Sequence, residues 1–310
     1  MSISEKYTLS LIKLNGNSAV SIYGINSSTL NKNVAYRIQH AAGIVDPGWI
    51  SVASIQPTVS IVATELAKIL GVTGSQGICI GTGQTYTSVD FYYAQMGQCA
   101  PRLSSTNHFR VSMSQGLLVP TQIQASQAET ATIGLDFHAV YDGTNAPMTF
   151  SSSVSLPAVA ALSEAFTMGK VMRNGSQLSG VQSFTIDFGL KVDKHMADGE
   201  LYPTFAGVAS ADPVISGKGF TLTDLSTMTL GGTAQGSTDS VVYLQACSKD
   251  GGLVAAATTS HISVTVDDGM LATEGAAGSN NEGQQADWFI RPIYDGSNAN
   301  LAIATGVAIS

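Results

Sequence analysis

The sequence predicts a mainly β protein, built as two tandem antiparallel β-sandwich or barrel domains, each with one packed helix and a long loop. Two observations lead to this prediction. Apolar and polar residues alternate with a period of two along several segments, as in strands with one buried face. In addition, residues 141–147 read YDGTNAP and residues 294–300 read YDGSNAN, so one turn occurs twice, 153 positions apart.

The repeat extends outward from this turn. At the same offset, His108 falls on His261 and Glu129 on Glu282. Further upstream, with a small change of offset, Pro47, Trp49 and Pro57 fall on Pro203, Phe205 and Pro213. We therefore predict two copies of one domain, residues 1–156 and 166–310. A connector, residues 157–165, joins them, and its Pro157 and Ala/Leu content favour a short helix.

Each copy is predicted to consist mostly of half-buried strands. The alternating apolar residues are Val34, Tyr36 and Ile38; Phe109, Val111 and Met113; Ile133, Leu135, Phe137, Ala139 and Tyr141; Phe184, Ile186, Phe188, Leu190 and Val192; and Ile262, Val264 and Val266. Val62, Leu66, Ile69 and Leu70 have helical spacing before Gly71, and Leu222 and Leu225 occupy the matching place. Long loops are expected over about 40–58 and 195–214.

Turn chemistry marks the ends of several strands. Asn15-Gly16 and Asn174-Gly175 are typical of hairpin turns, because glycine tolerates a positive φ. The Asp-Gly pairs of the repeated motif are expected to do the same, each after a tyrosine that ends a strand. The repeat-defining turns are therefore Tyr141, Asp142 and Gly143, and Tyr294, Asp295 and Gly296.

The composition restricts the function. Charged residues make up 12% of the chain and the net charge is −8, which argues against a nucleic-acid binder. So few charges suggest a surface that faces other subunits, or else a surface rich in Ser, Thr, Asn and Gln. The N-terminus lacks the features of a signal peptide, and no apolar run is long enough to cross a bilayer. Cys79, Cys99 and Cys247 are expected to be free, buried thiols.

The sequence offers no catalytic set, so we predict that the protein is not an enzyme and binds no cofactor or metal. The glycine-rich stretch 77–83 lacks the Lys-Ser/Thr of a phosphate-binding loop. His108 and His261 recur with the domain and are predicted to be structural hydrogen-bonding residues. Asp267-Asp268 leave a one-sided calcium site open, although the first copy has no carboxylates there.

The proline and aromatic residues of the two long loops are the candidate interface. Trp49 and Phe205 either tuck back onto their own domain or anchor in a neighbouring subunit. The residues predicted for a subunit or ring-stacking interface are Pro47, Trp49, Pro57, Pro203, Phe205 and Pro213.

These features together resemble the tail tube, or major tail, proteins of long-tailed bacteriophages. The resemblance is carried by the strand 183–192, by the Ala-Glu-Thr-Ala-Thr-Ile stretch at 128–133, and by the two YDG turns. It implies rings of six tube domains, joined edge to edge by strands and stacked through the long loops. It also implies an acidic bore that conducts DNA without binding it specifically.

With two domains in each chain, the resemblance implies a homotrimeric ring with pseudo-sixfold symmetry. The expected partners are further copies of the chain and other tail proteins at the tube ends, with no membrane insertion. The expected location is the virion tail, assembled in the cytoplasm of the host bacterium. Two alternatives remain at this point: a glycan-binding adhesin or tail-tip module, and a capsid decoration protein.

Overall fold

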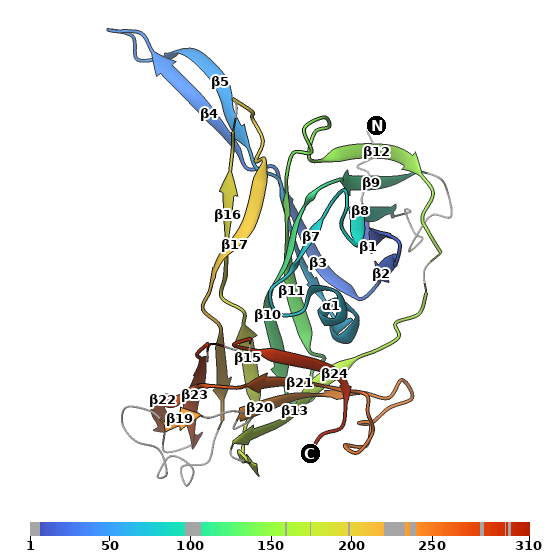
Figure 1. Cartoon of the computed structure of the whole chain (residues 1–310), viewed down its shortest axis with the longest axis vertical. Helices are drawn as coiled ribbons and strands as arrows, with labels where there is room; N and C mark the ends of the chain where they lie inside the picture. Colours follow the sequence, from blue (N-terminus) through green and yellow to red (C-terminus); the bar gives the residue numbers. More distant parts are fainter. Residues whose placement is uncertain are drawn as a thin grey trace.

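The computed structural model describes residues 7–96, 107–158, 160–173, 175–197, 199–219, 233–235, 240–279, 282–294, 296 and 299–310. For 233–235, 274–279 and 282–286 it describes the backbone alone. The protein is mainly β, and its sheets are antiparallel (Figure 1). Residues up to 158 are called the N-terminal half below, and residues from 160 onward the C-terminal half.

The N-terminal half contains twelve strands and one helix. They are β1 (Tyr7–Gly16), β2 (Val20–Ile22), β3 (Ile25–Asn31), β4 (Val34–His40), β5 (Pro47–Ile55), β6 (Thr58–Ala63), α1 (Leu66–Thr73), β7 (Ile78–Ile80), β8 (Tyr86–Gln95), β9 (His108–Met113), β10 (Gly116–Ser126), β11 (Thr132–Ala139) and β12 (Thr149–Val154).

The described part of the C-terminal half contains a further twelve strands. They are β13 (Phe166–Arg173), β14 (Ser176–Gln177), β15 (Ser183–Asp187), β16 (Leu190–His195), β17 (Phe205–Ala211), β18 (Val214–Lys218), β19 (Thr233–Gln235), β20 (Ser240–Ala246), β21 (His261–Val266), β22 (Gly269–Ser279), β23 (Glu282–Pro292) and β24 (Ala302–Val307). Leu222 and Leu225, which the sequence assigns to a second helix, lie outside the described residues.

The two halves share one strand order. A five-stranded sheet of order β12-β9-β8-β1-β2 corresponds to one of order β24-β21-β20-β13-β14. A ten-stranded sheet contains β7-β10-β11-β6-β3 from the N-terminal half and β19-β22-β23-β18-β15 from the C-terminal half. Each half adds a two-stranded hairpin, β4-β5 or β16-β17. None of the sheets closes into a barrel within the described part of the chain.

The irregularities of the strands recur as well. The register of β10 against β11 shifts between Pro120 and Ile123, and that of β22 against β23 shifts between Thr273 and Gly275. Since a bulge is an extra residue at one point of a ladder, its recurrence at matching places argues that both halves have the same backbone plan.

The predicted alternation matches the observed burial in most strands. Ile133, Leu135, Phe137 and Ala139 are buried, whereas Asp136 and His138 of the same strand are only half-buried. Side chains from the ten-stranded sheet and from both five-stranded sheets contribute to one buried apolar cluster. The strand predicted over 184–192 is interrupted, because β15 ends at Asp187 and β16 begins at Leu190.

The helix predicted after Val62 is present, but its bounds differ. Val62 belongs to β6, and α1 continues past Gly71 to Thr73. The buried residues Leu66, Ile69 and Leu70 hold it against the core. At eight residues, α1 is the only helix described, and none of the described structure provides a helix able to cross a membrane.

The prediction of a helical connector is wrong. The described residues of 155–165 form no helix. Instead, this segment caps α1: a carboxylate oxygen of Glu164 accepts the backbone N–H of Lys68 at 3.0 Å. A carboxylate near a helix N-terminus is stabilised by the free N–H groups and the helix dipole. The Ala/Leu composition favours helix locally, but the connector's polar contacts with α1 hold it in another conformation.

The prediction of two long loops is also wrong, because each of the two segments contains the second strand of a hairpin, β5 or β17. Each hairpin, β4-β5 and β16-β17, is called an arm below. The arms extend from one side of the molecule, and that of β4-β5 projects beyond the rest of the chain (Figure 1). Tyr36 and Ile38 are 60% and 55% exposed, so the core face predicted for this strand does not exist in the single chain.

The cysteines differ from the predicted buried thiols. Cys79 is exposed and Cys247 is half-buried, and both are free. Burial raises the pKa of the Cys247 thiol. Cys99 lies outside the described residues.

A glycine in β18 makes room for the largest core side chain. Gly217 pairs with Trp288, which is 1% exposed, and a Cβ on Gly217 would lie 2.2 Å from Cζ2 of the indole. The matching pair in the other half combines two medium-sized residues, Ile61 and Leu135. The two halves therefore fill equivalent positions of the core with side chains of different sizes.

Gly217→Ala is expected to lower the free energy of unfolding by about 1–3 kcal/mol, because the indole cannot move without disturbing a filled core. The control is Ser216→Ala on the exposed face of the same strand, which should change it by less than about 0.5 kcal/mol. Urea unfolding of the unassembled chain measures both. Equal effects of the two substitutions would show that Trp288 has space to move.

Candidate assembly interface

The two halves are joined through a continuous sheet. β10 of the N-terminal half pairs with β15 of the C-terminal half, with Gln122 opposite Asp187 and Ser126 opposite Ser183. Just beyond the ladder, Phe188 donates its N–H to the carbonyl of Thr121 at 3.0 Å. The junction is therefore made by backbone hydrogen bonds as well as by the shared apolar core.

The same sheet has an open edge at each end. β3 pairs only with β6 among the described strands, and segment 275–279 of β22 pairs only with β23. By strand order, β3 corresponds to β15 and β22 corresponds to β10. Within the described residues, the chain thus contains one formed junction and both unpaired sides of a second one. Open edges of this kind are sites where another chain can add.

The structure places the predicted interface residues in two groups. Trp49 and Phe205 lie on the arms and are 64% and 54% exposed, and Pro47 on the β4-β5 arm is also exposed. Pro57, Pro203 and Pro213 are buried within the chain. Both aromatic side chains are therefore more than half exposed in the single chain, although the ring of Phe205 lies 5.9 Å from that of His195.

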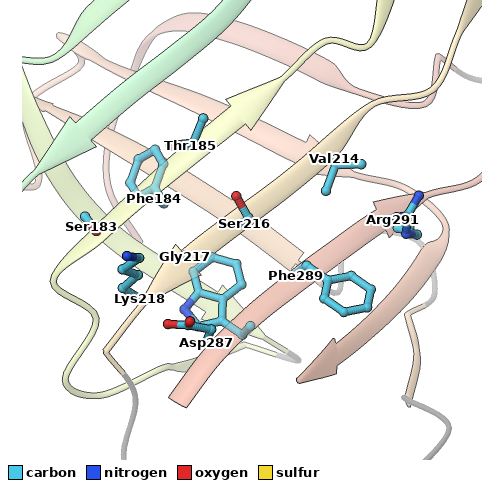
Figure 2. Close-up of a pocket in the computed structure, with 11 residues that line it drawn as sticks. Ser183, Phe184, Thr185, Val214, Ser216, Gly217, Lys218, Asp287, Phe289 and Arg291 are labelled. Atoms are coloured by element: carbon cyan, nitrogen blue, oxygen red, sulfur yellow. The ribbon is translucent and has the colours of Figure 1, made fainter. Parts of the chain in front are cut away.

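One face of the ten-stranded sheet points away from the core. Figure 2 shows a shallow pocket of about 260 Å³ on this face, formed by β15, β18 and β23. Lys218 and Asp287 occupy opposite positions on neighbouring strands near one end, and Arg291 lies near the other, 5.6 Å from the ring of Phe289. The pocket is open and combines opposite charges, so it does not select an ion of one sign.

The outward face is weakly charged. The described charged side chains on its strands are those of Asp136, Asp187, Asp287, Lys218 and Arg291. β22 and β23 also contain Glu274 and Glu282, whose side chains lie outside the described set. Burial, and then the charge of Lys194, lower the pKa of His138 to about 4, while Asp136 opposes the shift. His138 is therefore neutral at pH 7.

The YDG motif forms a loop that carries the chain from one sheet to another, which differs from the predicted hairpin turn. β11 ends at Ala139, and the next strand, β12, pairs with β9 in the five-stranded sheet. Asp142 accepts the N–H groups of Thr144 and Asn145 at 2.9 and 2.6 Å. These hydrogen bonds, that of Asn145 foremost, lower its pKa to about 2.

The glycines of both motifs have the predicted positive φ. Gly143 has a φ of 87° and Gly296 one of 91°. Tyr294 is 61% exposed. Asp295 is not among the described residues.

The two repeated histidines are structural, as predicted. His108 and His261 are 2% and 0% exposed. The Nδ1 atom of His108 accepts the N–H of Gln95 at 3.1 Å, and that of His261 accepts the N–H of Ala246 at 3.0 Å. Both acceptors lie at the same place in the strand order, so the hydrogen bond has been duplicated together with the fold.

The part of the chain that the structure describes contains no group of three His, Cys, Asp or Glu residues placed to bind a metal ion. Asp268 accepts the N–H of Gly269 at 2.7 Å, which assigns this carboxylate a local structural contact. No family model and no curated protein matches the chain.

The sequence did not indicate the two open edges. Segments 27–31 and 275–279 are rich in Ser, Gly and Ala and carry no charge. The residue pattern of these two segments is compatible with strands, but it does not show whether another strand pairs with the outer edge of each. The repeat points to these edges only after the structure is known. Because β15 pairs with β10, their counterparts β3 and β22 are expected to pair in the same way.

Proposed function

We propose that the protein is the structural subunit of a bacteriophage tail tube, with trimeric, pseudo-hexameric rings that stack into a hollow conduit for DNA. The observation that carries this proposal is the junction of β10 with β15, together with the open edges of β3 and β22. In this proposal each half is one tube domain, so three chains supply six.

The formed junction supplies a register for the open one. Matching positions through the common strand pairings relate Gln124 to Ala277, and Thr185 to Thr29. Since Gln124 lies opposite Thr185 within one chain, Ala277 would lie opposite Thr29 of the next. A contact between two different surfaces repeats head to tail, and it either closes into a ring or continues as a filament. Closure would leave no open sheet edge.

The outward face of the ten-stranded sheet would line the bore. Its strands contain five acidic residues, Asp136, Asp187, Glu274, Glu282 and Asp287, against the two basic residues Lys218 and Arg291. An acidic excess repels phosphates, and scattered basic residues do not form the continuous positive stripe typical of DNA-binding proteins. DNA would therefore pass without being held.

Electron microscopy of the purified chain tests the proposal. We expect hollow tubes of stacked rings whose class averages, viewed along the axis, show six similar lobes and true threefold symmetry. Exact sixfold symmetry, solid particles, or a monomer that persists at high protein concentration would contradict it. A decoration protein or an adhesin would give compact oligomers without a bore.

A further inference from the structure

The C-terminal arm is already docked on the N-terminal half. The carbonyl of Pro203, just before β17, accepts the N–H of Tyr141 at 2.8 Å, and that of Leu201 accepts the N–H of Ile55 at 2.8 Å. The rings of Tyr141 and Tyr202 lie 5.8 Å apart. β10 lies against both β16 and β17. The segment that joins the two strands of this arm is thus fixed on the neighbouring half.

This docking covers an apolar surface. Val140 is only 4% exposed, and it shares a cavity of about 190 Å³ with Phe205 and Ala206 of the arm. Tyr141 is half-buried, and Pro203 is buried. Val140 and Tyr141 of the N-terminal half together with Pro203 and Phe205 of the arm are called the formed dock below.

In the C-terminal half, the residues that correspond to Val140 and Tyr141 are exposed to solvent. At the offset of the YDG repeat, Val140 and Tyr141 correspond to Ile293 and Tyr294, which are 52% and 61% exposed. Local backbone structure does not explain this difference, because Val140 donates to Gln115 and Ile293 donates to the matching Asp268 at 2.9 and 2.8 Å. The described part of the C-terminal half therefore has the counterparts of Val140 and Tyr141, without an arm over them.

The β4-β5 arm has no surface to dock on within the described chain, and its apolar residues are exposed. Pro47 corresponds to Pro203 and Trp49 to Phe205, and Pro47 is exposed where Pro203 is buried. Val45, which corresponds to Leu201, is 91% exposed, and Ile50 on the same hairpin is 60% exposed. An arm with this many bare apolar side chains needs a partner surface.

We propose that the β4-β5 arm docks on the C-terminal half of a second copy of this chain, over Ile293 and Tyr294, in the manner of the formed dock. Tyr294 N–H then donates to the carbonyl of Pro47, and Trp49 occupies the place that Phe205 occupies within the chain. The inference rests on the ring of the proposed function, to which it adds the partner surface and the register.

The chain's own C-terminal half is not the partner. The β4-β5 arm projects from the end of the molecule opposite to β22 and β23 (Figure 1), and Ile293 directly follows β23. Each chain therefore has one free arm and one bare dock that it cannot bring together. A head-to-tail contact between copies occupies both. It also runs between the same two halves as the proposed pairing of β22 with β3.

Cross-linking with a short bismaleimide tests the docking. Asp46 corresponds to Tyr202, so the pair Asp46→Cys and Tyr294→Cys matches the ring contact of Tyr202 with Tyr141. The reference pair Tyr202→Cys and Tyr141→Cys reports the same geometry within one chain. Both pairs are made with Cys79, Cys99 and Cys247 replaced by Ser. Each single cysteine variant serves as a control.

The expected result is a covalent species of three chains on a denaturing gel for the Asp46→Cys, Tyr294→Cys pair, and cross-linked single chains for the reference pair. Single variants should give neither. Micrographs of the same samples separate the two proposals. Rings or tubes whose reference pair reacts while the test pair does not would overturn the docking and leave the tube intact. Folded chains that do not assemble, and whose Asp46→Cys, Tyr294→Cys pair does not cross-link, would overturn both proposals.

Trp49→Ala provides a second variant that keeps the fold, because Trp49 is exposed in the single chain. Truncating a central tryptophan anchor is expected to raise the protein concentration needed for assembly at least tenfold. Phe205→Ala is the matched change on the arm that is docked within the chain. Unchanged assembly by Trp49→Ala would overturn the place assigned to this side chain.

Discussion

The substitution Ser28→Pro is expected to leave the chain folded and to raise strongly the protein concentration at which it forms rings. Phe188 N–H donates to β10, and successive residues of a strand alternate in the side to which their N–H points, so Phe184 N–H points to β10 as well. Ser28 is the counterpart of Phe184, so its N–H points out of the open edge of β3. Ser28→Pro removes this donor and adds a ring in the path of a pairing strand.

Each of the three junctions in a ring would lose one hydrogen bond and leave a buried carbonyl without a partner, at a cost of about 2 kcal/mol. Because 1.4 kcal/mol is a factor of ten, each junction would be roughly 30-fold weaker. Sedimentation of the variant over a range of concentrations, together with its circular dichroism spectrum, measures assembly and folding separately.

Ser28→Ala is the matched control, because it loses the hydroxyl contact with Tyr93 but keeps the backbone N–H. It should assemble as the unaltered chain does. If Ser28→Pro formed rings at unchanged concentration, β3 would not be the edge that pairs between chains. If both variants failed to assemble, the Tyr93 contact, and not the open edge, would be responsible.

The repeat was the most informative property of the sequence, because it rests on residues whose roles are local. His108 and His261 each need only a neighbouring strand end to form their hydrogen bonds. Gly143 and Gly296 each need only a turn with positive φ. Such requirements are visible at the level of single residues and do not depend on which strands meet over long distances.

The β4-β5 arm could not be predicted, because its β4 strand has almost no buried side chains in the single chain. Period-two alternation indicates a buried face, and at Tyr36 and Ile38 this prediction is wrong for the single chain. Both side chains are more than half exposed, so no other part of the described chain covers that face. In β5, Trp49 and Ile50 are adjacent apolar residues, so the alternation fails and the segment resembles a loop.

The connector shows a different limit of sequence analysis. Its Ala and Leu residues give it a helical preference worth only tenths of a kcal/mol per residue. Ser163 and Glu164 instead bond to groups at the start of α1, about a hundred positions earlier in the chain. Tertiary contacts of this strength override a weak local preference, and nothing near residues 157–165 indicates that they exist.

Glu65 is expected to be the most important single polar side chain for stability, because it joins three segments. It is 0% exposed. Its carboxylate accepts the N–H groups of Tyr23 and Gly24 from the segment between β2 and β3, and the hydroxyl of Ser163 from the connector. It also forms an ion pair with Lys68 of α1. Glu65→Ala leaves these groups without their acceptor and should destabilise the fold by about 3–5 kcal/mol.

The pH dependence of stability distinguishes this role from simple packing. Burial raises the pKa of Glu65, but Lys68 and the two backbone N–H groups lower it more, so the folded pKa lies below the ordinary 4.5. The stabilisation by the carboxylate is therefore complete above pH 4.5 and is lost as the pH falls through the folded pKa. The stability difference between the unaltered chain and Glu65→Gln should be largest near pH 7 and should shrink below pH 4.5.

Glu164 supplies the control with the opposite sign. Burial, and then the nearby charge of Glu65, raise its pKa, although it accepts the N–H of Lys68. Its ionisation therefore opposes folding as the pH rises through 4.5 and above, so Glu164→Gln should gain stability relative to the unaltered chain in that range. Urea unfolding of both variants at pH 3.5, 5 and 7 gives the two trends. Parallel trends for Glu65→Gln and Glu164→Gln would show that the connector and α1 respond only to overall charge.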